Sequence, residues 1–239
     1  TPLQNQPSAR CLKVVVHDIT STQKEALTAY REAVQQSPRN AAAQLALGDV
    51  LADMGKRDEA LAAYRQAAAL DPASPTPRLG AAGLLVEAGD LAGARTELTA
   101  AIALDPKANH ARLSRGNVAL RTGDVKGALA DFEDAARREG RNPVVLYTLV
   151  RGLLANADIE AAERTADRLE TLAPQQPVAA YARALVSGAK GDRAAALEAL
   201  KRALAASPSE AKAAASDPAL AELREDPEVV ALLTRLQAL

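Results

Sequence analysis

The residue types that most often carry catalytic or metal chemistry are few and scattered in this sequence. Of 239 residues, two are histidines, His17 and His110, and one is a cysteine, Cys11. His17 precedes Asp18, but no Gly-x-Ser-x-Gly motif offers a nucleophile to this pair, so we interpret it as a solvated histidine. A single cysteine excludes an internal disulfide and a multi-cysteine metal site, and we interpret Cys11 as an idle thiol.

Two further patterns suggest phosphate binding but fail in detail. Gly55 and Lys56 resemble the end of a phosphate loop, but Arg57 replaces the required Ser or Thr, and no glycine lies five residues before Gly55. The densest basic spot, within 137–141, is explained by favourable charge at a helix C-terminus. The carboxylates are spread rather than clustered. We therefore predict no catalytic residues, no metal site, no cofactor and no enzymatic activity.

Composition limits the partners. The 29 Lys and Arg residues nearly cancel the 30 Asp and Glu residues, and aromatic residues make up only 2%. A basic stripe with interleaved aromatics is absent, which argues against nucleic acid. No apolar run reaches the roughly 18 residues that span a bilayer, so direct membrane insertion is not expected. An apolar fraction of 48%, mainly Ala and Leu, suits closely packed helix pairs.

Three columns of residues recur at one spacing. Glycines stand 34 residues apart at Gly55, Gly89, Gly123 and Gly191, with Ala157 in the skipped place. Alanines follow five residues later, at Ala60, Ala94, Ala128, Ala162 and Ala196. Prolines occupy Pro38, Pro72, Pro106, Pro174 and Pro208, and Gly140 takes the missing place. A repeat of this length is a helix–turn–helix unit.

The first full unit, 41–74, carries a family signature. Its matching residues are Leu47, Gly48, Leu51, Gly55, Ala60, Tyr64, Ala67, Leu70, Asp71 and Pro72, while Gln44 stands at the usual Trp position. The unit resembles a tetratricopeptide repeat. Four more units follow, at 75–108, 109–142, 143–176 and 177–210.

This resemblance implies an all-α fold, a right-handed α-solenoid. We expect about five full tetratricopeptide helix hairpins over 21–216, with an N-terminal arm or degenerate half-repeat at 1–20 and C-terminal capping helices at 217–239. A single unit cannot bury its apolar face, so stacking should give one continuous core without domain boundaries.

Each column has a physical role. Small residues such as Gly48 and Gly116 let the two helices of a unit approach closely, and Tyr64 and Phe132 fill the gaps between units. Glycine at the turn adopts positive φ easily. The neighbouring aspartates are good N-caps for the second helix: Asp90, Asp124, Asp158 and Asp192. Arg115 and Arg183 replace a packing Leu, so either their stems snorkel or their units are looser.

The two ends depart from the repeat. Residues 23–36 are predicted to form a helix equivalent to the second helix of a repeat. The β-branched run at 12–16 is predicted to be extended or weakly helical. At the other end, 227–238 reads as an amphipathic helix that starts at Asp226 and Pro227. Its polar side chains are expected to face water: Glu225, Asp226, Glu228 and Arg235.

In tetratricopeptide arrays the first helices line a concave groove, and the resemblance implies which positions point into it. We expect the partner-binding residues to be Leu79, Leu113, Asn117, Arg121, Tyr147, Arg151 and Tyr181. The apolar rungs would receive an apolar or amphipathic segment, and Asn117, Arg121 and Arg151 would orient it. Alternatively, the apolar rungs partly pack between neighbouring first helices.

The leading functional hypothesis is a protein–protein interaction scaffold that binds a peptide or helix of another protein in this groove. Self-association through the arm or an end helix is one alternative. A regulatory repeat segment of a larger enzyme is another. The polar start, Thr1 rather than Met, favours an exported or periplasmic protein slightly over a cytoplasmic one.

Overall fold

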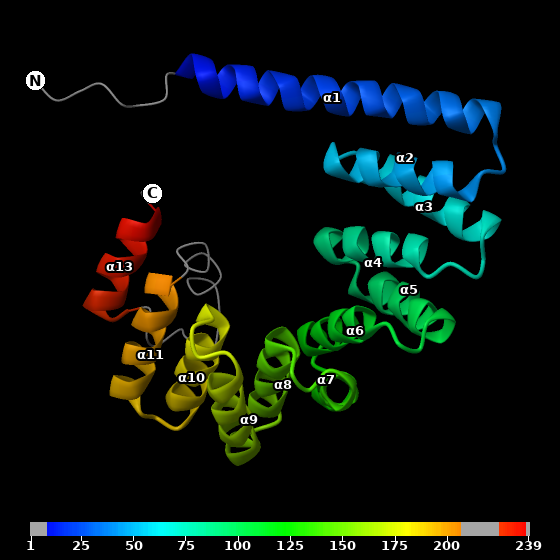
Figure 1. Cartoon of the computed structure of the whole chain (residues 1–239). Coiled ribbons are helices and arrows are strands. Elements are labelled where there is room, and N and C mark those ends of the chain that lie inside the picture. Colours follow the sequence, from blue (N-terminus) through cyan, green and yellow to red (C-terminus); the bar gives the residue numbers. More distant parts are fainter. Residues whose placement is uncertain (1–8, 207–224, 238–239) are drawn as a thin grey trace, which may run out of the picture. The chain divides into compact units, whose positions relative to one another are not determined.

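The computed structural model describes the backbone of residues 9–206 and 225–237, with side chains from Thr22 onward except at 232, 233 and 235–237 (Figure 1). No strand occurs in these ranges. The helices are α1 (Ala9–Gln36), α2 (Ala41–Asp53), α3 (Arg57–Leu70), α4 (Thr76–Ala88), α5 (Leu91–Leu104), α6 (Asn109–Arg121), α7 (Val125–Arg138), α8 (Pro143–Ala155), α9 (Ile159–Leu172), α10 (Pro177–Ala189), α11 (Arg193–Ala206) and α13 (Pro227–Gln237). The prediction of an all-α chain is confirmed.

The helices follow the 34-residue period. In each repeat an even-numbered first helix is paired with the odd-numbered second helix that follows it, as in α2 with α3 and α10 with α11. Within each compact unit of the chain, the second helix of a repeat packs against the first helix that follows, as α3 does on α4, α7 on α8 and α9 on α10. This stacking of hairpins is the arrangement of an α-solenoid.

The chain divides into two compact units, 1–111 and 112–239, with the division inside α6. The expectation of one continuous core therefore needs revision. In a stacked array each repeat contacts only the repeats next to it, so one chain can contain more than one compact unit. Unit 1 has a core around Leu51 and Tyr64, and unit 2 has cores around Leu146 and Leu200.

An aromatic ring fills the space between glycines in each unit. In unit 1, a Cβ added at Gly48 or at Gly80 would lie 2.6 Å from the Tyr64 ring. In unit 2, Phe132 lies in the same way between Gly116 and Gly152. Gly48 and Gly116 therefore allow the close helix approach that was predicted. The glycine of the following repeat also faces the ring, which was not predicted. The alanine column predicted to allow close approach is fully buried in all five repeats: Ala60, Ala94, Ala128, Ala162 and Ala196.

The turns inside the repeats use left-handed backbone. The four turn glycines have φ between +71° and +82°: Gly55, Gly89, Gly123 and Gly191. Ala157 takes the same place with φ +59° and is the one non-glycine residue with positive φ among the described residues. The predicted N-caps form, because Asp90, Asp124, Asp158 and Asp192 each accept a hydrogen bond from the backbone N–H three residues later.

The two arginines at packing positions are held by ion pairs on second helices. Arg115 donates to both carboxylate oxygens of Asp131 on α7, at 2.8 and 2.6 Å. Arg183 bonds Glu170 on α9 at 2.7 and 3.1 Å and also contacts Asp167. In both places the guanidinium bonds two helices at a position where apolar packing was expected.

The N-terminal segment differs from expectation. α1 is a single helix of 28 residues, so of the two alternatives predicted for the run at 12–16 the extended one is wrong. Helical continuity overrides the weak preference of β-branched residues for strands. The register of the later part is as expected, because α1 packs against α2 and Leu27 is buried in the unit 1 core. Figure 1 shows the first half of α1 extending past α2.

The C-terminal helix α13 packs against α11. Val229 is fully buried in the core formed by α10 and α11. Asp226 was expected to face water, but its side chain is only 15% exposed and pairs with Arg193 at 3.1 Å. Glu228 pairs with Lys201 on α11. Residues 207–224, which include the predicted end of the solenoid and the first part of the predicted capping segment, lie outside the described residues.

Candidate functional site

Three first helices of unit 2, α6, α8 and α10, position most of the predicted binding residues. α8 begins at Pro143, and the side chain of Asn142 caps it by accepting a hydrogen bond from the N–H of Val144 at 3.0 Å. Pro at the first helical position costs no hydrogen bond. The 34-residue period then places equivalent residues of successive repeats next to each other.

The ninth residues of two successive repeats are in contact. Arg151 on α8 donates from Nη1 to Oδ1 of Asn117 on α6 at 3.3 Å. This distance lies at the long end of the range for hydrogen bonds, so the bond is weak and easily exchanged. Both residues are half-buried, so neither is fully enclosed by the fold.

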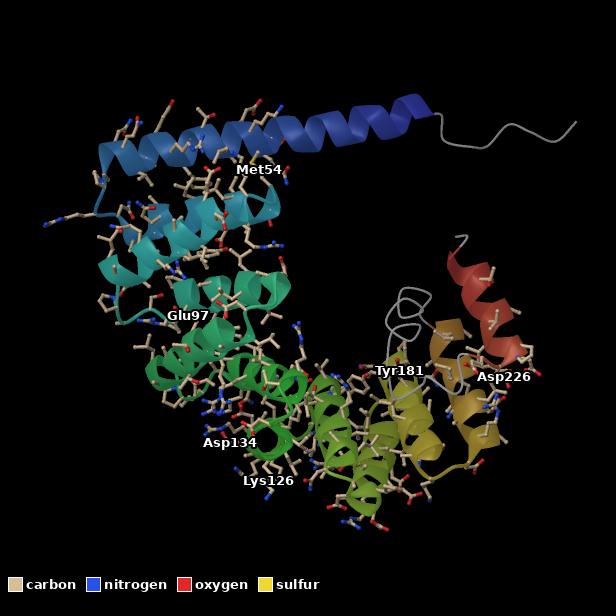
Figure 2. The ribbon with its side chains drawn as sticks, turned by 180° about the vertical axis from the view of Figure 1, so that it is seen from behind. Met54, Glu97, Lys126, Asp134, Tyr181 and Asp226 are labelled. Atoms are coloured by element: carbon tan, nitrogen blue, oxygen red, sulfur yellow. The ribbon has the colours of Figure 1, made fainter. Side chains whose placement is uncertain are left out.

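The fifth residues of the next pair of repeats are also in contact. The rings of Tyr147 on α8 and Tyr181 on α10 meet edge to face, with centroids 5.8 Å apart and planes at 62°. This geometry is favourable for aromatic pairs. Tyr147 is half-buried, whereas Tyr181, labelled in Figure 2, is only 6% exposed and belongs to the core of α10 and α11.

The two pairs join along α8. The guanidinium carbon of Arg151 lies 6.0 Å from the centroid of the Tyr147 ring, at the edge of the range for a cation–π contact. Asn117, Arg151, Tyr147 and Tyr181 thus form one connected row across α6, α8 and α10, which we call the α6–α8–α10 face. The row offers an amide, a cation and an aromatic surface, which are binding groups rather than reactive ones.

The remaining predicted residues lie beside or apart from this row. Leu113 on α6 is half-buried and packs against the cluster of Ala119, Ala128 and Phe132, which lies on α6 and the second helix α7. Arg121 is the exposed last residue of α6. Leu79 lies on α4 in unit 1, apart from the four joined residues.

Within the described residues, no group of three or more His, Cys, Asp and Glu side chains is placed to hold a metal ion. None of the described helices is both long enough and apolar enough to cross a membrane. A raised pKa lies outside the row, on Tyr64 of α3. Burial and then a hydrogen bond to Asp49 raise the pKa of Tyr64.

Sequence comparison decides the family. Profiles described as tetratricopeptide repeat match residues 24–75 and 79–143, and residues 119–186. Together these ranges cover more than half of the sequence. The chain belongs to the tetratricopeptide repeat family. No curated protein sequence is significantly similar to this tetratricopeptide repeat protein.

Solved structures agree with this fold. A tetratricopeptide repeat protein from Parabacteroides merdae is 17% identical with a TM-score of 0.69, covering 95% of this chain and 96% of that one. PilF of Pseudomonas aeruginosa is 19% identical with a TM-score of 0.66, covering 88% and 92%. YrrB is 19% identical with a TM-score of 0.62, covering 90% and 100%. The predicted tetratricopeptide solenoid is confirmed, and the repeats support a protein-interaction scaffold in general.

Proposed function

We propose that this tetratricopeptide repeat protein binds a peptide or helix of a partner protein on the α6–α8–α10 face. The observation that carries the proposal is the connected row from Asn117 through Arg151 and Tyr147 to Tyr181. An amide can both donate to and accept from a peptide backbone. A half-buried tyrosine offers apolar area with little loss of side-chain entropy on binding.

A structural relative supports the choice of ligand class. YrrB is described as a tetratricopeptide repeat protein with an unusual peptide-binding site. At 19% identity the likeness concerns the fold, so the proposal for this chain rests on its own residues.

The test starts from an unbiased peptide library displayed on phage. Peptides selected on the intact protein are synthesised, and their dissociation constants are measured by calorimetry. We expect the double substitution Tyr147→Ala and Asn117→Ala to weaken binding at least tenfold, because it removes both the apolar platform and the amide. Circular dichroism checks that the variant keeps its helices.

Tyr30→Ala is the matched control, since Tyr30 is an exposed tyrosine on α1. This control should bind the selected peptides as the unmodified protein does. Equal affinities for the double variant and the unmodified protein would exclude the α6–α8–α10 face as the binding site.

Self-association is a second candidate with its own observation. α1 has 28 residues against 13 in α2, so α2 can cover only part of it. The uncovered part could dock on another copy. Light scattering over a wide concentration range would decide, because a mass that stays at one chain removes this candidate.

A further inference from the structure

The first and second helices of unit 2 differ in charge. α6, α8 and α10 contain no Asp or Glu, and their ionised residues are Arg112, Arg115, Arg121, Arg151 and Arg183. The carboxylates of the helix pairs lie on α7, α9 and α11 instead. The first helices therefore carry positive charge only.

Three of these arginines are neutralised from the second helices. Arg112 pairs with Asp134 at 2.6 Å, and Arg115 holds Asp131 with two hydrogen bonds. Arg183 is bound by Glu170. Their charges are used inside the fold, because each guanidinium faces a carboxylate at hydrogen-bond distance.

Arg151 is different. Its contacts are the amide oxygen of Asn117 at 3.3 Å and the ring of Tyr147, and both groups are neutral. Among the residues whose side chains are described, none provides a carboxylate within ion-pair distance of Arg151. A half-buried guanidinium with neutral neighbours offers a planar fork of donors that matches a carboxylate.

Unit 1 shows the opposite pattern. Its first helices α2 and α4 carry Asp49, Asp53 and Glu87, and their one basic residue, Arg78, pairs with Glu97 at 3.1 Å. Glu87 also pairs with Arg57 at 3.8 Å, so among the described side chains the unpaired charges of these helices are the carboxylates of Asp49 and Asp53. An acidic ligand is therefore favoured less in unit 1 than in unit 2.

Resting on the proposed function, we infer that the α6–α8–α10 face binds an extended acidic segment of a partner protein. An Asp or Glu side chain of this segment forms a bidentate pair with Arg151. Asn117 exchanges its weak bond to Arg151 for bonds to the peptide backbone, and Tyr147 supports the guanidinium from one side. The recognised group is an internal side-chain carboxylate.

The experiment uses the intact protein and two labelled peptides with acetylated and amidated ends, so that terminal charges are absent. Aspartate alternates with leucine in one peptide, and asparagine alternates with leucine in the other. Fluorescence anisotropy gives the dissociation constants. We expect the aspartate peptide to bind about tenfold more tightly than the asparagine peptide, and to lose this advantage in high salt.

Arg151→Gln should remove the advantage, and Arg151→Lys should restore part of it, because lysine supplies the charge without the fork. Arg164→Gln is the control: it removes the same charge from an exposed position on the second helix α9. Its affinity for the aspartate peptide should not change.

Three outcomes would overturn the inference: equal binding of the two peptides, equal loss in Arg151→Gln and Arg164→Gln, or no binding of either peptide. If library-selected peptides still depend on Tyr147 and Asn117 in any of these cases, the proposed function stands and only the acidic specificity fails. A change of mass from dimer to monomer on Arg151→Gln would identify a second copy as the occupant and would also overturn it.

Discussion

Arg115 and Asp131 form a two-pronged bond between α6 and α7, with nitrogen–oxygen distances of 2.8 and 2.6 Å. The side chain of Asp131 is only 10% exposed, so Arg115 supplies hydrogen bonds that water cannot fully supply there. In the family a leucine normally packs at the position of Arg115. The ion pair therefore takes over part of the contact between the two helices.

A double-mutant cycle tests this bond. Arg115→Leu should destabilise the protein by about 2 kcal/mol because it leaves a nearly buried carboxylate unpaired. The value is below that of a fully buried pair, since Arg115 is 27% exposed. Adding Asp131→Ala should recover about 1 kcal/mol of the loss, because the unpaired charge disappears. Urea denaturation followed by circular dichroism gives each value. If the losses in the free energy of unfolding of the two single variants add up to the loss of the double variant, the ion pair contributes nothing to stability.

Substitution of a glycine beside Phe132 should be costly. A Cβ at Gly152 would lie 2.6 Å from Cδ2 of the ring, so Gly152→Ala must displace a fully buried side chain. We expect a loss of about 1–3 kcal/mol in the free energy of unfolding.

Gly188 provides the control, because it lies in α10 and a Cβ there meets no atom within 4 Å. Gly188→Ala should leave stability unchanged or raise it by about 0.5–1 kcal/mol, since alanine favours the helix. The same urea titration compares the two variants. An equal effect of both would contradict the close contact.

The turn at Ala157 stores strain. A non-glycine residue in left-handed backbone costs about 1–2 kcal/mol, and glycine removes this cost while losing more chain entropy on folding. Ala157→Gly should therefore stabilise the protein by about 0.5–1 kcal/mol. Gly123→Ala makes the reverse change at a φ of +80° and should destabilise it by about 1 kcal/mol. Thermal unfolding of both variants checks the opposite signs.

Asp134 should make stability depend on pH in acid. Partial burial raises its pKa, but hydrogen bonds from Arg137 and Arg138 and the charge of Arg112 outweigh burial, so its pKa lies below the ordinary value of 3.8. The folded state thus binds this proton less readily than the unfolded state, and the stabilisation is present above about pH 4. It is lost as the pH falls through the folded pKa.

Asp134→Asn tests this dependence. At pH 7 the variant should be less stable by about 2 kcal/mol, since Arg112, only 8% exposed, loses its charged partner. Near pH 3 the difference in the free energy of unfolding between the variant and the unmodified protein should become smaller. Urea midpoints at the two pH values measure it, and a constant difference would rule out titration of Asp134 as the cause.

The repeat and its turns could be predicted from the sequence because their causes are local. A fully buried alanine such as Ala60 and a turn glycine such as Gly89 each reflect one steric requirement at one position. Aspartate caps follow the same logic, because cap and backbone N–H are three residues apart. Contacts between repeats were harder, and the role of Gly80 and Gly152 against an aromatic ring was missed. Gly80 and Gly152 stand at different positions of their repeats, so no column of residues recurring every 34 positions marks them.

The candidate site could be predicted only in part. The resemblance selected Asn117, Arg151, Tyr147 and Tyr181 as groove residues, and the structure brings Asn117 into contact with Arg151 and Tyr147 into contact with Tyr181. How far each side chain is buried depends on the sizes of its neighbours on adjacent helices, which periodicity does not describe. Tyr181 is thus deeply buried while Tyr147 remains half-exposed. The ion pair of Arg183 was also missed, because its partners lie on the second helix of the preceding repeat.

The rings held between glycines limit how freely repeats can be exchanged. Phe132 belongs to one repeat, but the space it occupies depends on Gly152 of the next, and Tyr64 depends on Gly80 in the same way. A repeat grafted alone into another array would meet a side chain where its ring needs a gap. A repeat whose ring lies between two glycines must therefore be transferred together with the repeat that follows it. The smallest unit that can be grafted into another array is two helix hairpins rather than one.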